Sequence, residues 1–315
     1  MTDKIVDLTV NDGASCSRRS VHQILIYPEG QGGISINTED YKTLAAKEFV
    51  NDVIIDFFLN YLRLTILSEE QREKTHFFSS FFYERLSAVP SRDQRQAEKN
   101  LKMTVTQKRH NRVKRWTKNV NLFEKDFVVI PINKRNHWFL AIICFPGLDG
   151  PRTYSEGVPM RRLDRHQPIK QPCILIFDSM FEHAENHVVA TLRDYLTCEY
   201  QAKVFPMANP SSHVFNERNM PSHSVKLPQQ ENCFDCGLFL LQYAQEFFCD
   251  PIRDFRLPIR QLENWFWPVL PTRKREEIAK LLIQLIKESH PERLDLLPHI
   301  PFPTCDGRVI NEGEL

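Results

Sequence analysis

The sequence lacks an excess of charge of either sign. Its 315 residues include 41 Lys and Arg against 40 Asp and Glu, which leaves a formal net charge of +1. A chain without an overall positive field has no general attraction for nucleic acid, so any basic surface must be local. We therefore expect no nucleic-acid partner.

Long hydrophobic runs are also absent. No apolar run reaches the ~18 residues that a membrane helix requires, and residues 1–20 are polar with only short apolar runs, unlike a signal peptide. The eight cysteines lie at irregular spacings, which indicates free thiols in a reducing compartment rather than a disulfide framework. We expect an intracellular protein without a membrane partner.

Metal and dithiol motifs are nearly absent. Cys233 and Cys236 form a single Cys-x-x-Cys, with no second pair or His-x-x-x-His nearby to complete a zinc site. A thioredoxin-like pair would follow a strand in a short βαβ unit, and the long polar segment before Cys233 does not suggest one. The sequence disfavours both sites, and Cys233 is interpreted as a packing neighbour of Cys236.

Apolar residues are plentiful, at 42% of the chain with 22 Phe, and predict a substantial core. Apolar positions recur every three or four residues after Asn51, whose side chain is suited to cap a helix. Continuous apolar runs predict buried strands, and further periodic runs predict helices. The expected strands are 21–27, 127–132, 138–145 and 173–177. One helix is expected to start at 51 or 52, and others to cover 187–200, 236–248 and 273–287.

These elements predict one α+β domain over residues 22–290. Stretches rich in polar residues, Gly and Pro are expected to be insertions, near 91–112, 146–172 and 205–226. Residues 1–21 are expected to form a flexible tail, and residues 291–315 a Pro-interrupted tail.

The stretch 91–118 is strongly basic and carries ten Lys and Arg residues, from Arg92 to Lys118. A solvated helix or loop is the favoured interpretation, and a dedicated partner surface is the alternative. Residues 108–118 also resemble a weak nuclear-targeting signal.

The strongest chemical signal is Cys236, between Asp235 and Gly237 and directly before the apolar run 238–248. At the first position of a helix, the free N–H groups and the helix dipole favour the thiolate form. Gly237 removes a side chain where something must approach the backbone closely. A buried structural cysteine is the alternative.

A nucleophilic thiolate needs a base, an orienting acid and an oxyanion donor. His137 begins an apolar strand after a polar turn, and Asp178 ends the strand 173–177, so both are expected at the rim of the sheet. A carboxylate so close to an apolar layer needs a partner, and an imidazole N–H suits it. Gln230 could present an amide N–H to the oxyanion. Each residue alone also has an ordinary structural explanation.

Together these residues resemble the ubiquitin-like-protein protease family, the SUMO-specific cysteine peptidases. The matching stretches are residues 48–58, 113–117, 137–138, 177–180 and 228–237, within a resemblance that covers about 22–287. The variant details are most similar to the poly-SUMO-editing branch of sentrin-specific proteases six and seven. The resemblance implies a papain-like cysteine protease fold, with a central mixed sheet packed by helices and the nucleophile at a helix N-terminus.

Site roles follow from the resemblance. It implies Cys236 as nucleophile, His137 as general base and acid, Asp178 as the orienting acid and Gln230 as oxyanion donor. Phe49, which stands where most relatives have Trp, and Trp138 would form a tunnel for a Gly-Gly tail, and Asp52 would contact the folded modifier. Only glycines fit between two aromatic walls, which makes such a tunnel selective.

The implied activity is cleavage after the Gly-Gly C-terminus of SUMO through a Cys thioester, in poly-SUMO chains and on targets. The implied partners are SUMO and poly-SUMO conjugates, acted on by a monomer without cofactor or metal. A nuclear location is expected, with the cytoplasm as an alternative. A protease for another ubiquitin-like modifier and a weakly active SUMO-binding scaffold are the competing hypotheses.

The N-terminal tail holds a second short motif, Ile5, Val6, Asp7 and Leu8, between Asp3 and Asp12. A β-branched run flanked by acids can add as a strand to another protein's sheet, and this one resembles a SUMO-interacting motif. An ordinary first strand or an unstructured tail explains it equally well.

Overall fold

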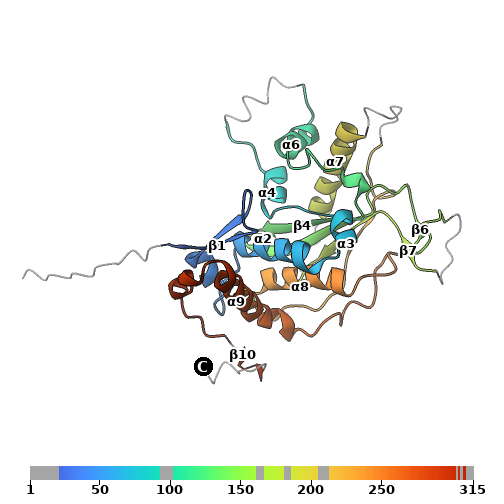
Figure 1. Ribbon diagram of the computed structural model, residues 1–315. Coiled ribbons are helices and arrows are strands. Elements are labelled where there is room, and N and C mark those ends of the chain that lie inside the picture. Colours follow the sequence, from blue (N-terminus) through green and yellow to red (C-terminus); the bar gives the residue numbers. More distant parts are fainter. Residues whose placement is uncertain are drawn as a thin grey trace, which may run out of the picture.

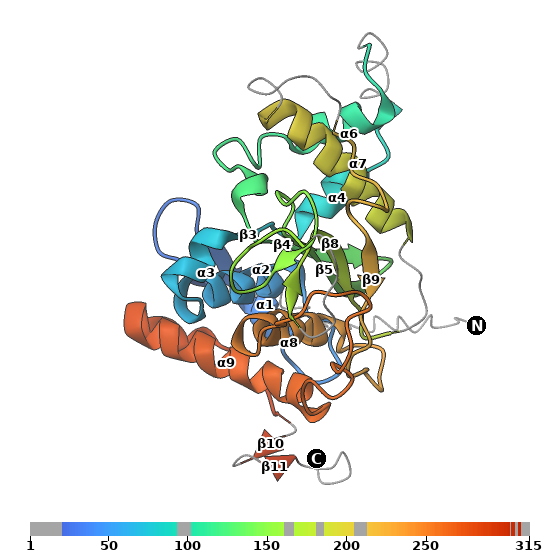
Figure 2. The ribbon, with the colours of Figure 1, turned by 90° about the vertical axis from the view of Figure 1, so that its right-hand side faces the viewer.

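The structure, a computed structural model, describes residues 21–92, 102–160, 167–180, 186–204, 213–302, 304–305 and 308–309. A five-stranded sheet lies at its centre (Figure 1), in the order β3-β4-β5-β8-β9, and these strands are labelled in Figure 2. The three middle strands pair antiparallel, and each edge strand runs parallel to its neighbour. The strands are β3 Thr75–Phe77, β4 Phe127–Lys134, β5 His137–Cys144, β8 Cys173–Phe177 and β9 Ser222–Ser224. The predicted mixed sheet is confirmed.

Helices cover both faces of the sheet, because strand side chains alternate between two apolar clusters. Leu140 and Ile142 face one cluster, and Phe139 and Ala141 face the other. The first cluster contains residues of α2 (Asp52–Tyr61), α8 (Cys236–Cys249) and α9 (Val269–Ser289), and the second contains residues of α4 (Phe81–Ser87), α6 (Val105–Val113) and α7 (Asn186–Lys203). Figures 1 and 2 show α4, α6 and α7 on the side of the sheet opposite α8 and α9. The result is a three-layer α+β domain.

Shorter elements complete the chain. The strand pairs are β1 (Gln23–Tyr27) with β2 (Ile34–Asn37), β6 (Arg152–Thr153) with β7 (Ile169–Lys170), and β10 (Thr304–Cys305) with β11 (Arg308–Val309). The helical pieces are α1 (Thr38–Lys42), the π-helix η1 (Leu62–Ile66), α3 (Glu69–Lys74), and the 3₁₀ turns η2 (Leu122–Glu124) and η4 (Pro291–Leu296). Within the described ranges, no helix is both long and apolar enough to cross a membrane.

The helix predicted after Asn51 is α2. The Asn51 side chain accepts a hydrogen bond from the Ile54 N–H at 3.1 Å, which satisfies one of the unpaired donors of the first turn. Its amide group also donates to Asp40 at 2.8 Å. The cap therefore fixes the start of α2 and ties it to α1, directly beside Phe49.

The apolar run after Gly237 forms α8, whose first residue is Cys236, as predicted. A Cβ at Gly237 would lie 3.3 Å from both Ile55 Cδ1 and Trp138 Cδ1. These contacts are tight for a methyl group, so glycine allows α8 to approach α2 and β5 closely. The close approach predicted at Gly237 is therefore made by core side chains.

Two expected insertions contain parts of the core. The stretch 205–226 includes β9, which hydrogen-bonds to β8, and the buried residues Phe215 and Met220. The expected boundaries there were too wide, because a three-residue strand of Ser and His has no apolar signature. In the stretch 146–172, Ile169 is fully buried, although β6 and β7 form only a short ribbon.

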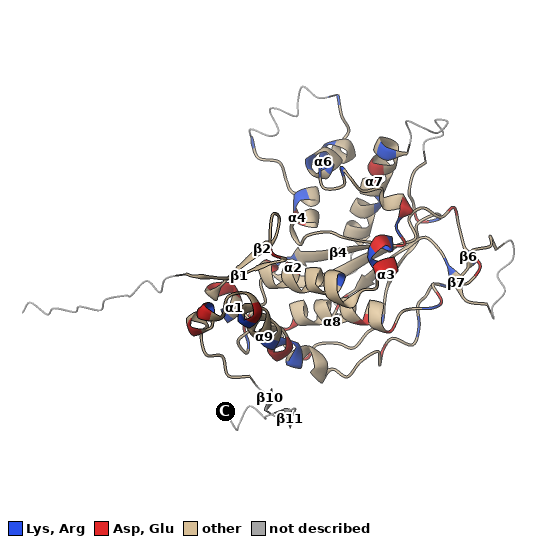
Figure 3. Ribbon diagram, viewed as in Figure 1, with Lys and Arg blue, Asp and Glu red and all other residues tan. Residues whose placement is uncertain are grey.

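The basic stretch is only partly solvated. α6 packs between α4 and α7, and its residues His110 and Val113 are buried. His110 Nε2 lies 2.6 Å from Oε2 of Glu199, a carboxylate on α7 that is also buried. Figure 3 shows Lys and Arg positions along α6, while α3 and α9 carry residues of both signs. The prediction of a simple solvated element was therefore wrong for the packed face.

Candidate active site

The end of the sheet brings His137 and Asp178 together. β5 and β8 are antiparallel with Leu140 opposite Phe177, so the start of β5 and the end of β8 meet at one edge. His137 is the first residue of β5, and Asp178 directly follows β8. His137 Nε2 lies 2.6 Å from Asp178 Oδ1, although the residues are 41 positions apart in the chain.

Asp178 is held in place by its own contacts. The Met180 N–H donates to Asp178 Oδ1 at 2.9 Å, and Gln229 Nε2 donates to the Asp178 carbonyl at 3.1 Å. The carboxylate side chain is only 12% exposed, so little water competes with the imidazole for it. A shielded carboxylate of this kind fixes the tautomer and orientation of a histidine.

Cys236 completes the group from the third element. α8 packs against β5, which places the helix N-terminus beside the start of the strand. His137 and Cys236 lie close enough for the sulfur to act on the imidazole and raise its pKa. Because Asp178 is bound to Nε2 of His137, Nδ1 is the ring nitrogen left to exchange a proton with Cys236.

The environment makes His137 a stronger base than an ordinary histidine. Partial burial by itself lowers the pKa of His137, but the hydrogen bonds and charges of Asp178 and Cys236 outweigh it and raise the pKa from 6.5 to about 9. The imidazole is therefore protonated at neutral pH and presents a positive charge to the sulfur.

Gln230 lies in the same region, but its amide group is partly engaged. Ser179 Oγ donates to Gln230 Oε1 at 2.6 Å, and Gln230 Nε2 donates to the Asn232 carbonyl at 2.6 Å. The Gln230 N–H also donates to the Ser179 carbonyl at 3.2 Å. A primary amide has two N–H donors, so one donor remains for a ligand while the other helps to fix the side chain.

A groove of about 430 Å³ is lined by the neighbour of His137 in the chain. Its lining includes Phe49, Asp52 and Trp138. Trp138 is buried and its Nε1 donates to the Val50 carbonyl at 3.1 Å, whereas Phe49 is 51% exposed. Trp138 follows His137 in the chain and contacts the space at Gly237, so the groove ends beside the Cys236 helix.

Comparison with known families identifies the chain. The model of the Ulp1 protease family, C-terminal catalytic domain, matches residues 48–284. The chain belongs to the Ulp1 protease family.

Relatives within this family share about a third of the sequence. Mouse (Mus musculus) sentrin-specific protease 7 is 37% identical over 305 residues, covering 84% of this chain and 28% of that protein. Mouse sentrin-specific protease 6 is 27% identical over 437 residues, covering 84% of this chain and 38% of that protein. The chain thus spans only about a third of the length of these Ulp1-family relatives.

Solved structures show the same Ulp1-family fold. A de-sumoylating protease superposes with a TM-score of 0.60 at 23% identity, covering 84% of this chain and 91% of that one. The C-terminal Ulp1 protease domain in complex with Smt3, the yeast ortholog of SUMO, gives 0.54 at 21% identity, covering 85% and 90%. At this identity the likeness establishes the fold.

Several residues fall outside the Ulp1-family site described above. The candidate motif Ile5, Val6, Asp7 and Leu8 lies outside the described residues. Cys233 has a free, exposed thiol, so its interpretation as a packing residue was wrong. Among the residues with described positions, no cluster of His, Cys, Asp or Glu could hold a metal ion.

Our sequence interpretation missed two contributors to the Ulp1-family site. Ser179 belongs to one of the matching stretches, but its bond to Gln230 was not predicted. Arg275 is buried and contacts Asp235, yet it occurs in a charged amphipathic helix among other Lys and Arg residues. A hydroxyl beside Asp178 was a usable signal, whereas nothing local distinguishes Arg275 from a solvated arginine.

Proposed function

We propose that this chain is a SUMO-specific cysteine protease that cleaves after the C-terminal Gly-Gly of SUMO. One observation carries the proposal: His137, paired with Asp178 at 2.6 Å, lies beside Cys236, the first residue of α8. Phe49 and Trp138 line a groove, and Trp138 directly follows His137 in the chain. A weakly active binding scaffold would not need this arrangement.

The chemistry follows from the geometry. The Cys236 sulfur, paired with the His137 imidazolium, attacks the glycine carbonyl and forms a tetrahedral oxyanion. Gln230 and the N-terminal N–H groups of α8 donate to that oxyanion. Collapse breaks the C–N bond, and His137 gives its proton to the leaving lysine amine. Water, deprotonated by His137, then hydrolyses the thioester and frees the SUMO carboxylate and the thiol.

The groove explains selection of a Gly-Gly tail. Trp138 is fixed by its hydrogen bond to Val50, so it forms a rigid wall. Phe49 is half exposed and forms the opposite, less constrained wall. A side chain on either glycine would clash between two aromatic rings, so other tails are excluded by sterics. Asp52, at the start of α2 and in the same groove, would contact the folded part of SUMO.

SUMO is the proposed modifier because related proteins point to it. The relatives are named sentrin-specific proteases 7 and 6, and one solved Ulp1 protease domain is in complex with a SUMO ortholog. Preference for poly-SUMO chains, the N-terminal SUMO-interacting motif, monomeric action and nuclear location remain predictions of the resemblance.

A pair of suicide substrates tests the proposal. We expect rapid formation of a covalent adduct with SUMO propargylamide and none with ubiquitin propargylamide, read by mass shift on a gel. Peptide mapping should place the adduct on Cys236. Adduct formation with ubiquitin alone would establish a protease for another modifier, and no adduct with either would contradict the proposal.

The raised pKa of His137 predicts an alkaline limit to activity. Below about pH 9 the imidazole is protonated and can supply the leaving amine with a proton; above it, the neutral ring cannot. We therefore expect kcat/KM for a SUMO–lysine isopeptide to fall as the pH rises through about 9. Asp178→Asn removes a charge that raises the pKa of His137, so the decline in kcat/KM should occur at lower pH in this variant.

A SUMO thioester substrate provides the control for the pH profile, because its thiolate leaving group needs no proton. Its cleavage should decline less above pH 9 than cleavage of the isopeptide. If kcat/KM of Asp178→Asn declines at the same pH as that of the wild type, a group other than His137 causes the decline.

A further inference from the structure

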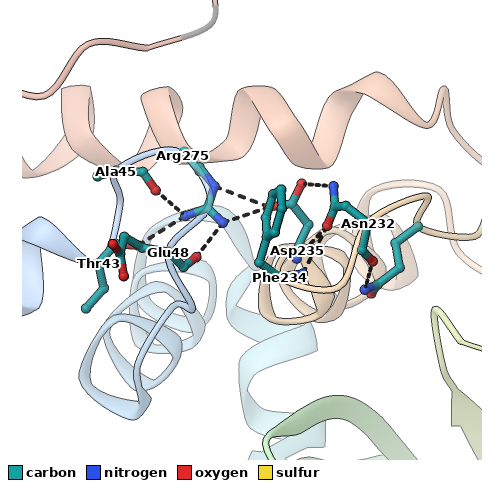
Figure 4. Close-up of polar contacts among 8 residues, drawn as sticks. Thr43, Ala45, Glu48, Asn232, Phe234, Asp235 and Arg275 are labelled. Atoms are coloured by element: carbon teal, nitrogen blue, oxygen red, sulfur yellow. Dashed lines mark hydrogen bonds and ion pairs between the residues drawn. The ribbon is translucent and has the colours of Figure 1, made fainter. Parts of the chain in front are cut away.

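α9 carries none of the residues predicted for catalysis. One of its side chains, Arg275, nevertheless contacts Asp235, the residue before Cys236. Arg275 is 2% exposed, and its guanidinium makes five hydrogen bonds. A guanidinium has five N–H donors, so every donor is used. Figure 4 shows the guanidinium between two segments that are distant in sequence. Each N–H donor of Arg275 therefore has an acceptor in the surrounding structure.

One side of the Arg275 guanidinium holds the residue before the nucleophile. Nε and Nη2 donate to Asp235 Oδ1 at 3.2 and 2.7 Å. Asp235 is itself only 2% exposed and directly precedes Cys236. Arg275 thus fixes the carboxylate nearest in sequence to the reacting sulfur.

The other side holds the segment that leads to the groove. Arg275 Nη1 donates to the carbonyls of Thr43 and Ala45 at 3.1 and 2.9 Å, and Nη2 donates to the Glu48 carbonyl at 2.7 Å. Glu48 directly precedes Phe49, the exposed wall of the groove. One side chain therefore links the nucleophile's helix to the wall that would face a substrate tail.

Asp235 behaves unusually for an acid before a helix. An Asp at this position normally accepts hydrogen bonds from the N–H groups of the first turn. Here its side chain makes no such bond: Oδ1 is taken by Arg275, and Oδ2 accepts from Asn232 Nδ2 at 2.9 Å. The carboxylate is drawn away from the end of α8, which keeps the first N–H groups available for a developing oxyanion.

The same contacts extend to Gln230. Asn232 Oδ1 accepts from the N–H groups of Phe234 and Asp235, and the Asn232 carbonyl accepts from Gln230 Nε2 at 2.6 Å. A continuous set of hydrogen bonds therefore runs from α9 through Asp235 and Asn232 to the proposed oxyanion donor. Figure 4 shows Asn232, Asp235 and Arg275 in this order.

The charge of Arg275 also neutralises the Asp235 carboxylate beside the nucleophile. A buried carboxylate adjacent to Cys236 would oppose negative charge on the sulfur and on the oxyanion. Asp235 and Arg275 are both 2% exposed and their closest atoms are 2.7 Å apart, so the positive charge largely cancels the negative one.

We propose that Arg275 is a positioning residue of the active site. It aligns the start of α8, the Gln230 amide and the Phe49 wall by holding Asp235 and the 43–48 segment on one rigid guanidinium. The proposal rests on the proposed cysteine-protease function, which it deepens. It assigns the buried face of α9 a part in turnover in addition to its packing.

The first test is Arg275→Lys in the full chain, with turnover of a SUMO–aminocoumarin amide as readout. Lysine keeps the charge but cannot make the five-donor fork. We expect kcat to fall about tenfold or more, since small misplacements of reacting groups cost about that much or more. KM should change less than about threefold, because most of the SUMO surface is contacted elsewhere.

Lys274→Gln is the matched control. Lys274 precedes Arg275 on α9 and is equally buried, but it contacts Glu277 and Gln245 instead of the site. Both variants are compared by thermal unfolding. A kcat that falls equally in both at similar stability, or an unchanged kcat in Arg275→Lys, would overturn the proposal.

A second measurement does not depend on the modifier or on Arg275→Lys turnover. Alkylation by iodoacetamide is followed separately at Cys236 and at exposed Cys233 by peptide mapping. Loosening of the fold would speed reaction of the buried Cys236, whereas loss of positioning should slow it severalfold and leave Cys233 unchanged. Faster alkylation of Cys236 in Arg275→Lys would contradict the proposal, even if the SUMO probes showed another modifier to be the substrate.

Asn232→Ala covers the case in which Arg275→Lys does not fold. Asn232 is only half-buried, so its loss is easier to tolerate. We expect a drop in kcat of about fivefold in this single variant. Where Arg275→Lys folds, the double variant should be no slower than the slower single variant, because residues in one network are not additive. A wild-type kcat in Asn232→Ala would break the proposed connection to Gln230.

Discussion

Replacing Cys236 by alanine is expected to abolish both the SUMO propargylamide adduct and the cleavage of SUMO isopeptides. The alanine leaves His137, Asp178 and the groove in place but removes the sulfur that lies beside the His137 imidazole. No other side chain at the start of α8 can form the thioester, so turnover should fall by at least about 10³-fold. Binding of SUMO, measured by calorimetry, should stay within about twofold, because most of a protein interface lies outside the reacting atoms.

The matched control is Cys233→Ala. Cys233 lies three positions earlier on the same segment and its free thiol is exposed, which makes it chemically accessible. We expect normal adduct formation in this variant. An adduct that persists in Cys236→Ala and disappears in Cys233→Ala would mean that the exposed thiol is the nucleophile.

Replacing His137 by alanine should lower kcat about 10³-fold or more while leaving SUMO affinity nearly unchanged. The variant loses the imidazolium that stabilises the thiolate and the proton that the leaving amine needs. Its loss also leaves the Asp178 carboxylate without the partner at 2.6 Å, in a place that is only 12% exposed. Steady-state cleavage of SUMO–aminocoumarin measures the fall in kcat, and calorimetric binding of SUMO measures the affinity.

His290→Ala is the control for this variant. His290 lies at the end of α9 and is partly exposed, paired loosely with Glu292 at 3.6 Å. Its turnover should equal that of the wild type. A large loss of SUMO binding in His137→Ala would show that the ring serves recognition, and a near-normal kcat would remove it from the proposed mechanism.

Prediction from the sequence was accurate where local pattern decides. The apolar run after Gly237 gives α8 with its first residue correct, and the periodicity after Asn51 gives α2, which begins at Asp52 with Asn51 as its cap. Helix caps and apolar spacing act within a few residues, so they can be read directly. The strand runs placed His137 and Asp178 at sheet ends for the same reason.

Prediction failed where an element depends on distant partners. β9 is a strand because β8 offers it hydrogen bonds, and its own residues are polar. α6 is packed because His110 meets a buried Glu199, a contact that its basic composition hides. The contacts of Gln230 are equally hidden in the sequence, because only the fold brings Ser179 and Asn232 to the amide whose N–H was expected to reach the oxyanion.

The sequence by itself determined the types of group available: one thiol at a helix start, a histidine and an acid at strand ends, and a glutamine upstream. The tertiary structure decided which of them meet and at what distance. His137 and Asp178 are 41 positions apart, and Arg275 and Thr43 are 232 apart. Such contacts arise from sheet register and helix packing, which depend on the whole core. Arg275 therefore looks solvated in the sequence, although the fold places its guanidinium beside the residue that precedes the nucleophile.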